Sequence, residues 1–522
     1  MRYDYVVIGA GSAGCVLANR LSALPDRSVL LLEAGGSHRH MNTHIPAAFP
    51  KLFKTKRDWD YMTEPETSLK GRSVYIPRGK MLGGSSSMNA MIYIRGRRED
   101  YDGWAAAGCK GWSFDDILPY FRRSEDNARI RDEYHGIGGE LHVDDLRSPN
   151  PLSRAFVDAC VQWGMPANDD FNGASQSGAG FYQVTQRRGA RWSAAHAFLR
   201  PVRKRPNLTA ETGAHATRLI VESDRVTGVA YVVGGERRVA HAEREVVVAA
   251  GAINSPQLLM LSGIGPADHL RDVGIDPVAD LPVGDNLQDH PVVMMVYECP
   301  APVSLADAEK PKALLEYLAF RRGMLSSNIG ESGCFVKTRS DRDAADVQFH
   351  FGPAFFVEHG FQTYDGHAFS MGPTLVSVES RGTVRLASAN PFDKMRITGN
   401  YLTADADMQA MVAGVRLGRE IAHQRAFDDF RGREIYPGPD YQTDAEVEEY
   451  IRQVAELLYH PVGTCAMGPQ GSAVVDPELR VNGIEGLRVA DASVMPVIPG
   501  GNTNAPTIMI AERAADLMLH SS

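Results

Sequence analysis

The glycine pattern at the start of the chain constrains its fold more than any other feature. A strand-like apolar run at residues 5–8 stops at Gly9, and Gly11 and Gly14 follow at the spacing of a dinucleotide-binding turn. Gly9 would permit the tight turn, Gly11 would let backbone N–H groups approach a pyrophosphate, and Gly14 would let helix and strand pack closely. A helix that begins here would direct its unpaired N–H groups toward the phosphates. The pattern therefore predicts a strand–turn–helix unit that binds a dinucleotide.

The second predicted strand supports this interpretation. The buried-strand run at residues 28–32 ends at Glu33, at the spacing from which an acidic side chain reaches a ribose 2′-hydroxyl. Its carboxylate would repel a 2′-phosphate, so the pattern disfavours a dinucleotide that carries one. The alternative is an ordinary glycine turn in a unit that binds nothing.

The length and charge of the chain narrow the class of protein. With 522 residues it is too long for one compact core, so at least two domains are expected. A net charge of −9 gives no basic surface for nucleic acid, and six scattered cysteines without a CxxC pair predict neither a disulfide framework nor a metal cluster. The first strand starts almost at Met1, which leaves no room for a signal peptide, and no run of about twenty apolar residues could span a bilayer. The expected location is the cytoplasm, with peripheral contact to the inner membrane left open.

Strand-like runs recur far along the chain and predict two interleaved domains. Runs between residues 219 and 251 and at 487–493 would rejoin the first unit, whereas alternating runs at 347–351 and 377–386 are typical of an antiparallel sheet. The predicted fold class is α/β, with a Rossmann-like dinucleotide-binding domain interleaved with an α+β substrate-binding domain built on an antiparallel sheet. The expected boundaries are 1–150, 205–290 and 455–522 for the first domain and 151–204 and 291–454 for the second.

Apolar periodicity predicts the longer helices of both domains. They are expected over residues 101–123, 191–199, 408–422, 443–458 and 508–518. The last of these follows a Gly-Gly-Asn-Thr-Asn turn, so its N-terminus could stabilise negative charge on a bound cofactor.

A second glycine-rich stretch lies at residues 77–93. Gly83 and Gly84 precede three serines and then an apolar segment. Backbone N–H groups and serine hydroxyls are what a second phosphate contact or a flavin contact needs. On the residues alone, a Ser/Gly loop that caps a helix stays open as the competing interpretation.

Three further motifs give the chain a family resemblance. They are residues 79–92, residues 251–265, and the His-Pro-Val-Gly-Thr-Cys run at 460–465 with Asn502 downstream. With these motifs the chain resembles the glucose–methanol–choline (GMC) oxidoreductases over essentially its whole length. Within that family it looks most like bacterial alkanol dehydrogenases of the alkane-utilisation type and choline-dehydrogenase-like flavoproteins.

The resemblance implies FAD bound in an extended form and oxidation of an alcohol to a carbonyl. It also implies that Glu33 holds the adenosine ribose, that Ala216 lies by the adenine, and that Asp491 and Ala492 lie near the ribityl chain. The residues expected to bind FAD are Gly9, Gly11, Ser12, Ala13, Gly14, Glu33, Ala34, Trp59, Gly83, Gly84, Asn89, Ala90, Met91, Ile92, Ala216, Asp491, Ala492 and Thr503.

The resemblance also assigns the chemistry. Because FAD can accept a hydride from the alcohol carbon, the protein must supply a base for the hydroxyl proton. His460 is the expected base, since an imidazole is largely neutral at pH 7, and Asn502 would hydrogen-bond to the alcohol oxygen. A histidine before a proline is more often structural, and only the family match reverses that interpretation. His350, Val292 and Tyr459 are expected to line the substrate pocket.

Two departures from the pattern of relatives refine the prediction. Relatives with covalently attached flavin carry a histidine where this chain has Met88, so non-covalent FAD is expected. Choline-oxidising relatives place a carboxylate where this chain has Val292, two residues after the pair Asp289 and His290. Because valine cannot pair with a quaternary ammonium, the predicted substrate is a neutral primary alcohol, aliphatic or benzylic.

The electron acceptor and the oligomeric state stay open. The sequence has no second dinucleotide fingerprint, so a nicotinamide acceptor is not expected. The resemblance favours a quinone or another carrier. The alternatives are an alcohol oxidase that uses oxygen and releases hydrogen peroxide, a non-redox FAD-containing lyase of the same fold, and a plain Rossmann protein that binds NAD.

Overall fold

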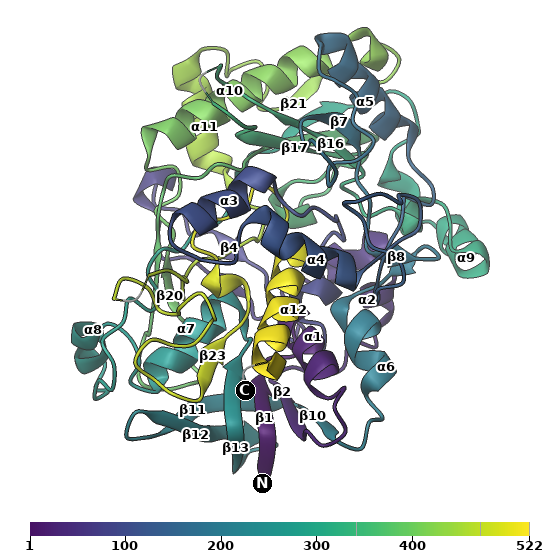
Figure 1. Ribbon diagram of the computed structural model, residues 1–522. Helices are drawn as coiled ribbons and strands as arrows, with labels where there is room; N and C mark the ends of the chain where they lie inside the picture. Colours follow the sequence, from purple (N-terminus) through teal and green to yellow (C-terminus); the bar gives the residue numbers. More distant parts are fainter. Residues whose placement is uncertain (341, 470, 521–522) are drawn as a thin grey trace.

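Two β-sheets organise the computed structural model of the chain, which describes residues 1–340, 342–469 and 471–520 (Figure 1). The lower sheet consists of β10 (Leu208–Thr212), β2 (Val29–Glu33), β1 (Arg2–Ile8), β13 (Glu236–Val248), β12 (Arg225–Val233) and β11 (Ala214–Glu222) in that order, with β23 (Leu487–Val489) paired to β13. From β10 to β13, and on to β23, neighbouring strands are parallel. β12 extends the sheet as the antiparallel neighbour of β13, and β11 pairs antiparallel with β12.

The predicted strand–turn–helix unit is present at the centre of this sheet. β1 and β2 pair in parallel, and α1 (Ser12–Leu21) connects them. A Cβ atom added to Gly14 would lie 1.8 Å from the carbonyl oxygen of Gly9, so only glycine lets the helix approach the turn this closely. α1 packs against the C-terminal helix α12 (Asn504–His520), which brings both ends of the chain into one layer (Figure 1).

The upper sheet is antiparallel, as predicted. It consists of β21 (Glu434–Tyr436), β15 (Met295–Glu298), β18 (Ala368–Leu375), β17 (Val347–Gly352), β16 (Ser332–Val336) and β7 (Gly178–Phe181) in that order, with β14 (Pro291–Val292) paired to β18 and β22 (Glu456–Leu457) paired to β14. α5 (Pro151–Trp163) and α10 (Asp405–Ala422) pack on this sheet, and α11 (Asp444–Val454) packs on α10.

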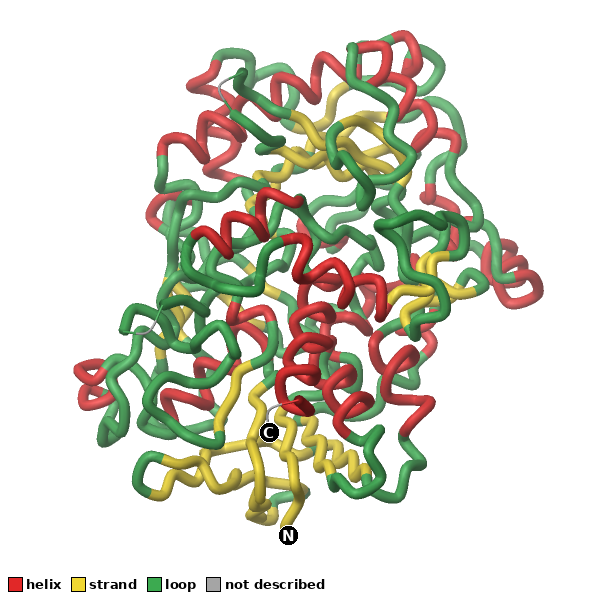
Figure 2. The backbone as a smooth tube through the Cα atoms, viewed as in Figure 1, coloured by secondary structure: helices red, strands yellow, loops and turns green. Residues whose placement is uncertain are grey.

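The chain passes repeatedly between the two sheets. Figure 2 shows the strands of the large sheets in two regions, with helices and loops between them. Residues 178–181 lie in the upper sheet, residues 208–248 in the lower, residues 291–375 supply most of the upper sheet, and residues 487–489 return to the lower. This alternation confirms the predicted α/β fold with two interleaved parts. The domain boundaries stay a prediction, and β22 joins the upper sheet although the boundary at 455 would count it with the lower domain.

The prediction of one helix over residues 101–123 is wrong. Two helices occupy this region, α3 (Arg98–Ala106) and α4 (Phe114–Ser124). Gly108 and Gly111 lie between them with φ angles of 103° and 81°, in the left-handed region that ends a helix. The apolar periodicity continues across these glycines, which is why it indicated one element.

Two further predictions need correction in the middle of the chain. Residues 191–199 do not form one helix, because Arg191 ends the short strand β9 (Ala190–Arg191) and a π-helical turn covers Ala195–Leu199. Residues 377–386 contain only β19 (Thr383–Arg385), which pairs with a short strand outside the two large sheets.

The last two predicted helices exist with different ends. α11 stops at Val454, and the residues after it turn into β22 instead of continuing to 458. α12 begins at Asn504, about one turn before the predicted start at 508. Among the helices of the described residues, none combines the length and the apolar character needed to cross a membrane.

Candidate active site

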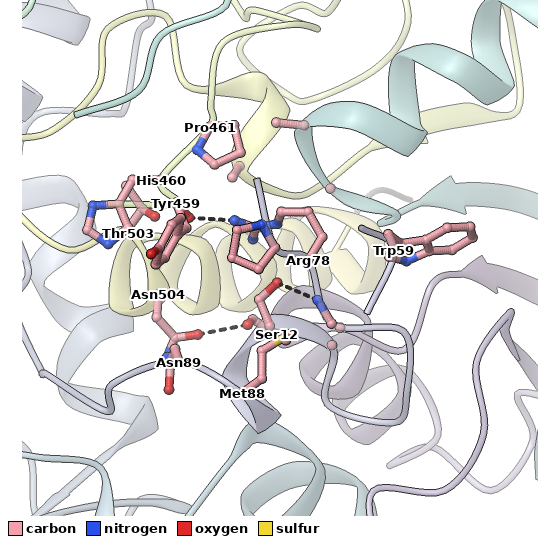
Figure 3. A pocket seen from close by; sticks show the side chains of 18 of the residues that line it. Ser12, Trp59, Arg78, Met88, Asn89, Tyr459, His460, Pro461, Thr503 and Asn504 are labelled. Carbon is pink, nitrogen blue, oxygen red and sulfur yellow. Dashed lines mark hydrogen bonds between the residues drawn. The ribbon is translucent and has the colours of Figure 1, made fainter. Parts of the chain in front are cut away.

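An elongated cavity connects the two sheets. It begins at the carboxyl ends of β1 and β2, where open parallel sheets bind ligands, and reaches β14 and β17 of the upper sheet. Trp59 lies at one end of the view in Figure 3 and His460 at the other, with Ser12 and Met88 between them. The cavity therefore begins where a dinucleotide is expected to bind and continues to the upper sheet, as an extended dinucleotide requires.

Most residues predicted for the site lie around this one cavity. Those that line it are Gly9, Gly11, Ser12, Ala13, Glu33, Ala34, Trp59, Gly84, Asn89, Ala90, Met91, Ile92, Ala216, Val292, His350, Tyr459, His460, Asp491, Ala492, Asn502 and Thr503. Gly14 and Gly83 do not line it. Gly14 packs behind the turn against Gly9, and the backbone N–H of Gly83 donates to the carbonyl of Ala10 at 2.7 Å, so both shape the wall from behind.

Two helix N-termini meet at the middle of the cavity. The N-cap of α1 is Gly11, which has no side chain to satisfy the first N–H groups, and the space beside its Cα is open. The hydroxyl of Ser12 donates to Asn504 Oδ1 at 2.7 Å and so ties α1 to the start of α12. A Cβ atom on Gly84 would lie 2.7 Å from the Cα of Gly11. This cradle of free N–H groups fits the diphosphate of a dinucleotide.

Glu33 stands at the end of β2 with its carboxylate in the cavity wall. Its two oxygens accept the backbone N–H groups of Ala10 at 2.9 Å and Gly35 at 2.7 Å. Burial raises the pKa of Glu33 to about 7, against the effect of these two hydrogen bonds. Each oxygen keeps a lone pair, so the side chain can still accept a hydroxyl of a ribose.

Asp491 lines the cavity, but its carboxylate already accepts hydrogen bonds from other groups of the protein. Its carboxylate accepts from the backbone N–H of Gly251 at 2.8 Å, from the hydroxyl of Ser255 at 2.5 Å and from the backbone N–H of Ser493 at 2.8 Å. Asp491 therefore fixes the start of α7 (Gly251–Leu261) against β23, whatever it adds to cofactor binding.

The end of the cavity at Trp59 has aromatic walls. Trp59 stacks on Tyr61 with their rings 12° from parallel, and the ammonium of Lys80 lies 4.2 Å from the Trp59 ring centroid. His215, which was not predicted from the sequence, lines this end beside Ala216, and its ring centroid lies 5.9 Å from that of Trp59. Flat apolar faces of this kind fit a purine base.

His460 and Asn502 lie side by side at the opposite end of the view from Trp59. Asn502 Nδ2 is 3.3 Å from His460 Nε2, and Gln348 Nε2 donates to Asn502 Oδ1 at 3.4 Å. Because Gln348 engages the amide oxygen, the amide N–H faces the histidine. His460 Nδ1 is 3.0 Å from Nδ1 of His290. The arrangement fits a neutral imidazole that donates from Nδ1 and keeps a lone pair on Nε2.

Asp289 and His290 support this pair from behind. Asp289 Oδ1 accepts the backbone N–H groups of both His290, at 2.7 Å, and His460, at 2.8 Å. Burial raises the pKa of Asp289 to about 7. The sequence reasoning used these two residues only as a landmark for the choline position and missed their role, because nothing local to them indicates contact with a residue 170 positions later.

The electrostatics keep the histidines of this end uncharged. Burial lowers the pKa of His460 well below 6.5, and the nearby His290, His350 and Arg78 lower it further. Burial likewise lowers the pKa of His290 and of His350 to about 3. His350 lies on β17, two residues from Gln348, and its Nδ1 is 3.1 Å from the hydroxyl of Thr374.

Beyond His460 the cavity is mostly apolar. The residues that form this part, besides Val292 and Tyr459, are Phe49, Phe53, Met294, Ile329 and Phe356. None of them was predicted, because they come from loops and short elements that carry no motif. The polar edge is a small cluster, in which Nδ1 of His359 is 2.5 Å from the Tyr459 hydroxyl and 3.5 Å from the Glu456 carboxylate. Burial raises the pKa of Glu456 to about 7.

Comparison with known proteins agrees with this geometry. Two family models, both described as GMC oxidoreductase, match residues 3–292 and 378–511. The chain is similar to an alcohol dehydrogenase [acceptor] of Pseudomonas putida, 46% identical over 99% of this chain and 96% of that one. It is 45% identical to an oxygen-dependent choline dehydrogenase of Vibrio vulnificus, over 99% and 94% of the two chains. A solved pyridoxine 4-oxidase from Mesorbium loti superposes with a TM-score of 0.92 at 34% identity and covers both chains fully.

Proposed function

Since the chain belongs to the GMC oxidoreductase family and is an FAD-dependent oxidoreductase of the kind that acts on alcohols, we propose that its substrate is a neutral primary alcohol, oxidised to the aldehyde. The family predicted from the sequence is confirmed. The observation that carries the finer proposal is the His460–Asn502 pair, which stands where the dinucleotide-shaped part of the cavity meets its apolar part.

The protein groups that would hold FAD follow from the cavity. The N-termini of α1 and α12 and the backbone at Gly84 would contact the diphosphate, Glu33 a ribose, and Trp59 the adenine end. When bound, FAD supplies the acceptor for the hydride that leaves the alcohol carbon. Met88 lines the cavity and has no nucleophilic atom suited to a flavin link, so we propose that FAD is held non-covalently.

His460 and Asn502 would divide the work on the alcohol oxygen. The lone pair on His460 Nε2 accepts the hydroxyl proton, because the buried imidazole is neutral at pH 7. The amide N–H of Asn502 donates to the same oxygen and fixes the direction of the C–H bond. His290 would hold the imidazole in place through its contact with Nδ1, and it would carry part of the charge that protonation creates.

The substrate class follows from the walls of the apolar part. Phenylalanine, methionine and isoleucine side chains suit an aliphatic or benzylic chain, and Val292 offers no charge to a quaternary ammonium. Among the described residues that line this part, Glu456 is the acidic one, and its pKa, raised to about 7, leaves about half of it uncharged at pH 7. Choline is therefore disfavoured, even though a choline dehydrogenase is 45% identical.

The proposed electron acceptor is a quinone or another carrier. The Pseudomonas relative is named for an acceptor rather than for oxygen, which supports this choice. Oxygen is the second candidate, because the Vibrio relative is named as oxygen-dependent. The proposed location is the cytoplasm.

Anaerobic mixing with alcohols tests the proposal. We expect 1-octanol or benzyl alcohol to bleach the visible absorbance of the bound flavin, while choline does not. The variant His460→Ala should still bind FAD but reduce it slower by roughly two to four orders of magnitude. Bleaching of wild-type protein by choline alone would contradict the substrate class. If no alcohol bleaches the flavin, the result favours the hypothesis that the protein is a non-redox FAD-containing lyase. After bleaching, air and a soluble quinone tested separately would identify the acceptor.

A further inference from the structure

A short helix at the edge of the molecule has no structural partner for most of its surface. α9 (Pro311–Phe320) projects from the right-hand side in Figure 1. Only Ala313 and Tyr317, four residues apart on one face, are buried. The Tyr317 side chain packs on Ile45 and Ala48, so the helix is anchored along a single stripe.

The opposite face of α9 is apolar and open to solvent. Leu314, Leu315 and Leu318 are 36%, 67% and 54% exposed, and at 100° per residue they share one side of the helix. Phe320 at the end of the helix is 59% exposed. Nowhere else in the described part of the chain do more than two large apolar side chains of such exposure fall within ten residues. A cluster of this kind usually marks a contact surface.

Basic residues flank this apolar face on both ends. Lys310 and Lys312 lie at its start, and Arg321 and Arg322 follow its end, whereas Glu316 is the one acid between 310 and 322. Residues 310–322 carry four positive charges and one negative charge, a net charge of +3 in a chain whose net charge is −9. Two of the four cations also form ion pairs on the surface, Lys310 with Asp307 at 2.7 Å and Arg322 with Glu316 at 3.1 Å, which offset part of this charge. The positive charge would attract an anionic surface, and the long Lys and Arg stems let their charged ends reach it while the leucines insert.

The anchor of α9 adjoins the substrate part of the cavity. The hydroxyl of Tyr317 donates to the carbonyl of Gly189 at 3.0 Å, and the ring packs on Ala48. The next residue, Phe49, lines the apolar end of the cavity. A surface that binds α9 would therefore lie beside the part of the protein that we expect to receive an apolar alcohol.

We propose that α9 docks the enzyme on an anionic lipid surface. Leu314, Leu315, Leu318 and Phe320 would enter the boundary between headgroups and acyl chains, with the four basic residues among the headgroups. A benefit in collecting membrane-dissolved alcohols rests on the proposed function, whereas the docking itself does not.

Vesicle flotation of the FAD-loaded enzyme tests this proposal. Wild-type protein should float with vesicles that contain phosphatidylglycerol and much less with vesicles of phosphatidylcholine alone. The double variant Leu315→Ser/Leu318→Ser should bind at least about tenfold more weakly, because both inserted side chains lose their apolar surface. Lys312→Glu should weaken binding to the anionic vesicles only. The matched control is Ile137→Ser/Val278→Ser, which removes two exposed apolar side chains elsewhere and should bind like wild type.

Two further measurements separate the possible failures. Flavin reduction by water-soluble benzyl alcohol should be the same in wild type and both double variants, so a failure of the alcohol proposal appears there and not in flotation. Light scattering gives the mass in solution. If wild-type protein ignores anionic vesicles, or if the leucine variant floats as well as wild type, the proposal is overturned. If the same variant instead turns a dimer into a monomer, the face belongs to a second copy of the chain.

Discussion

The imidazole of His460 works in surroundings that keep it uncharged. Burial, followed by His290, His350 and Arg78, lowers its pKa well below 6.5. Protonated His460 cannot accept the hydroxyl proton, so flavin reduction should slow only when the pH falls through this lowered pKa. We predict that anaerobic stopped-flow rates with benzyl alcohol stay flat down to about pH 6, below the point where an ordinary imidazole is half protonated. A rate that halves near pH 6.5 or above would contradict the role of burial.

The side chain at Val292 should decide whether a cation is accepted. Val292 is the direct cross-strand partner of Glu456. A carboxylate at position 292 would therefore lie beside the carboxyl group of Glu456, and two negative charges there would repel each other. We predict that Val292→Glu lets choline reduce the flavin, because a quaternary ammonium relieves this repulsion. Reduction by 1-octanol should slow by about tenfold or more, since the apolar wall then carries a charge.

The neutral variant Val292→Gln is the matched control that separates the effect of the added charge from the effect of the larger side chain. It has nearly the same shape as Val292→Glu and should not accept choline. Equal choline reduction in both variants would show that space, and not charge, excludes choline from the wild-type protein. No choline reduction in either variant would show that this position does not face the bound alcohol.

Among the elements, the turn before α1 and the loop at Gly84 depend on each other. Gly84 has a φ of 51°, and a Cβ there would lie 2.7 Å from the Cα of Gly11. We predict that Gly84→Ala separates the two backbones at a cost of ~1–3 kcal/mol and weakens FAD binding by about tenfold or more. Equilibrium dialysis of the apoprotein against FAD measures this. Gly36→Ala, where a Cβ meets nothing within 4 Å, should bind FAD normally.

The short elements also show which parts of the site the sequence could predict. The turn at Gly9, the acid at Glu33 and the His460 motif are local patterns, and all three lie around one cavity. Phe49 lies in a short 3-10 helix and Phe356 in a loop, neither of which carries a motif, and only tertiary packing brings their ring centroids within 6.3 Å of each other. The helix over 101–123 was mispredicted for the opposite reason, because apolar periodicity alone does not register a break at Gly108 and Gly111.

At the scale of the whole molecule, the antiparallel sheet and the interleaving could be predicted from strand patterns, but the partner of each strand could not. β14 and β22 are each two residues long and lie 164 or more positions apart. Their pairing sets Val292 beside Glu456 and brings His460 to His290. Such contacts depend on the assembled sheet, so no local pattern could indicate them.

Stability of the whole fold should depend on a buried histidine cluster away from the active site. The ring centroid of His196 lies 4.6 Å from that of His38 and 5.1 Å from that of His44. Burial lowers the pKa of His38 to about 4 and that of His196 to about 3. A histidine whose folded pKa is depressed stabilises the fold above its unfolded pKa of about 6.5, and this stability is lost as the pH falls toward the folded value.

Buried acids act in the opposite direction over the same range. The pKa values of Glu33 and Asp289 are raised to about 7, so they stabilise the fold below their unfolded pKa values and lose this effect as the pH rises through 7. The change of wild-type stability with pH is therefore the difference between the histidine effect and the acid effect, and a variant that removes the histidines isolates the first.

We predict that His38→Gln/His196→Gln loses less thermal stability than wild type between about pH 7 and pH 5. His423→Gln, at an exposed histidine, should keep the wild-type slope in the same thermal-shift measurement. Parallel slopes for wild type and the double variant would mean that the cluster does not titrate with unfolding.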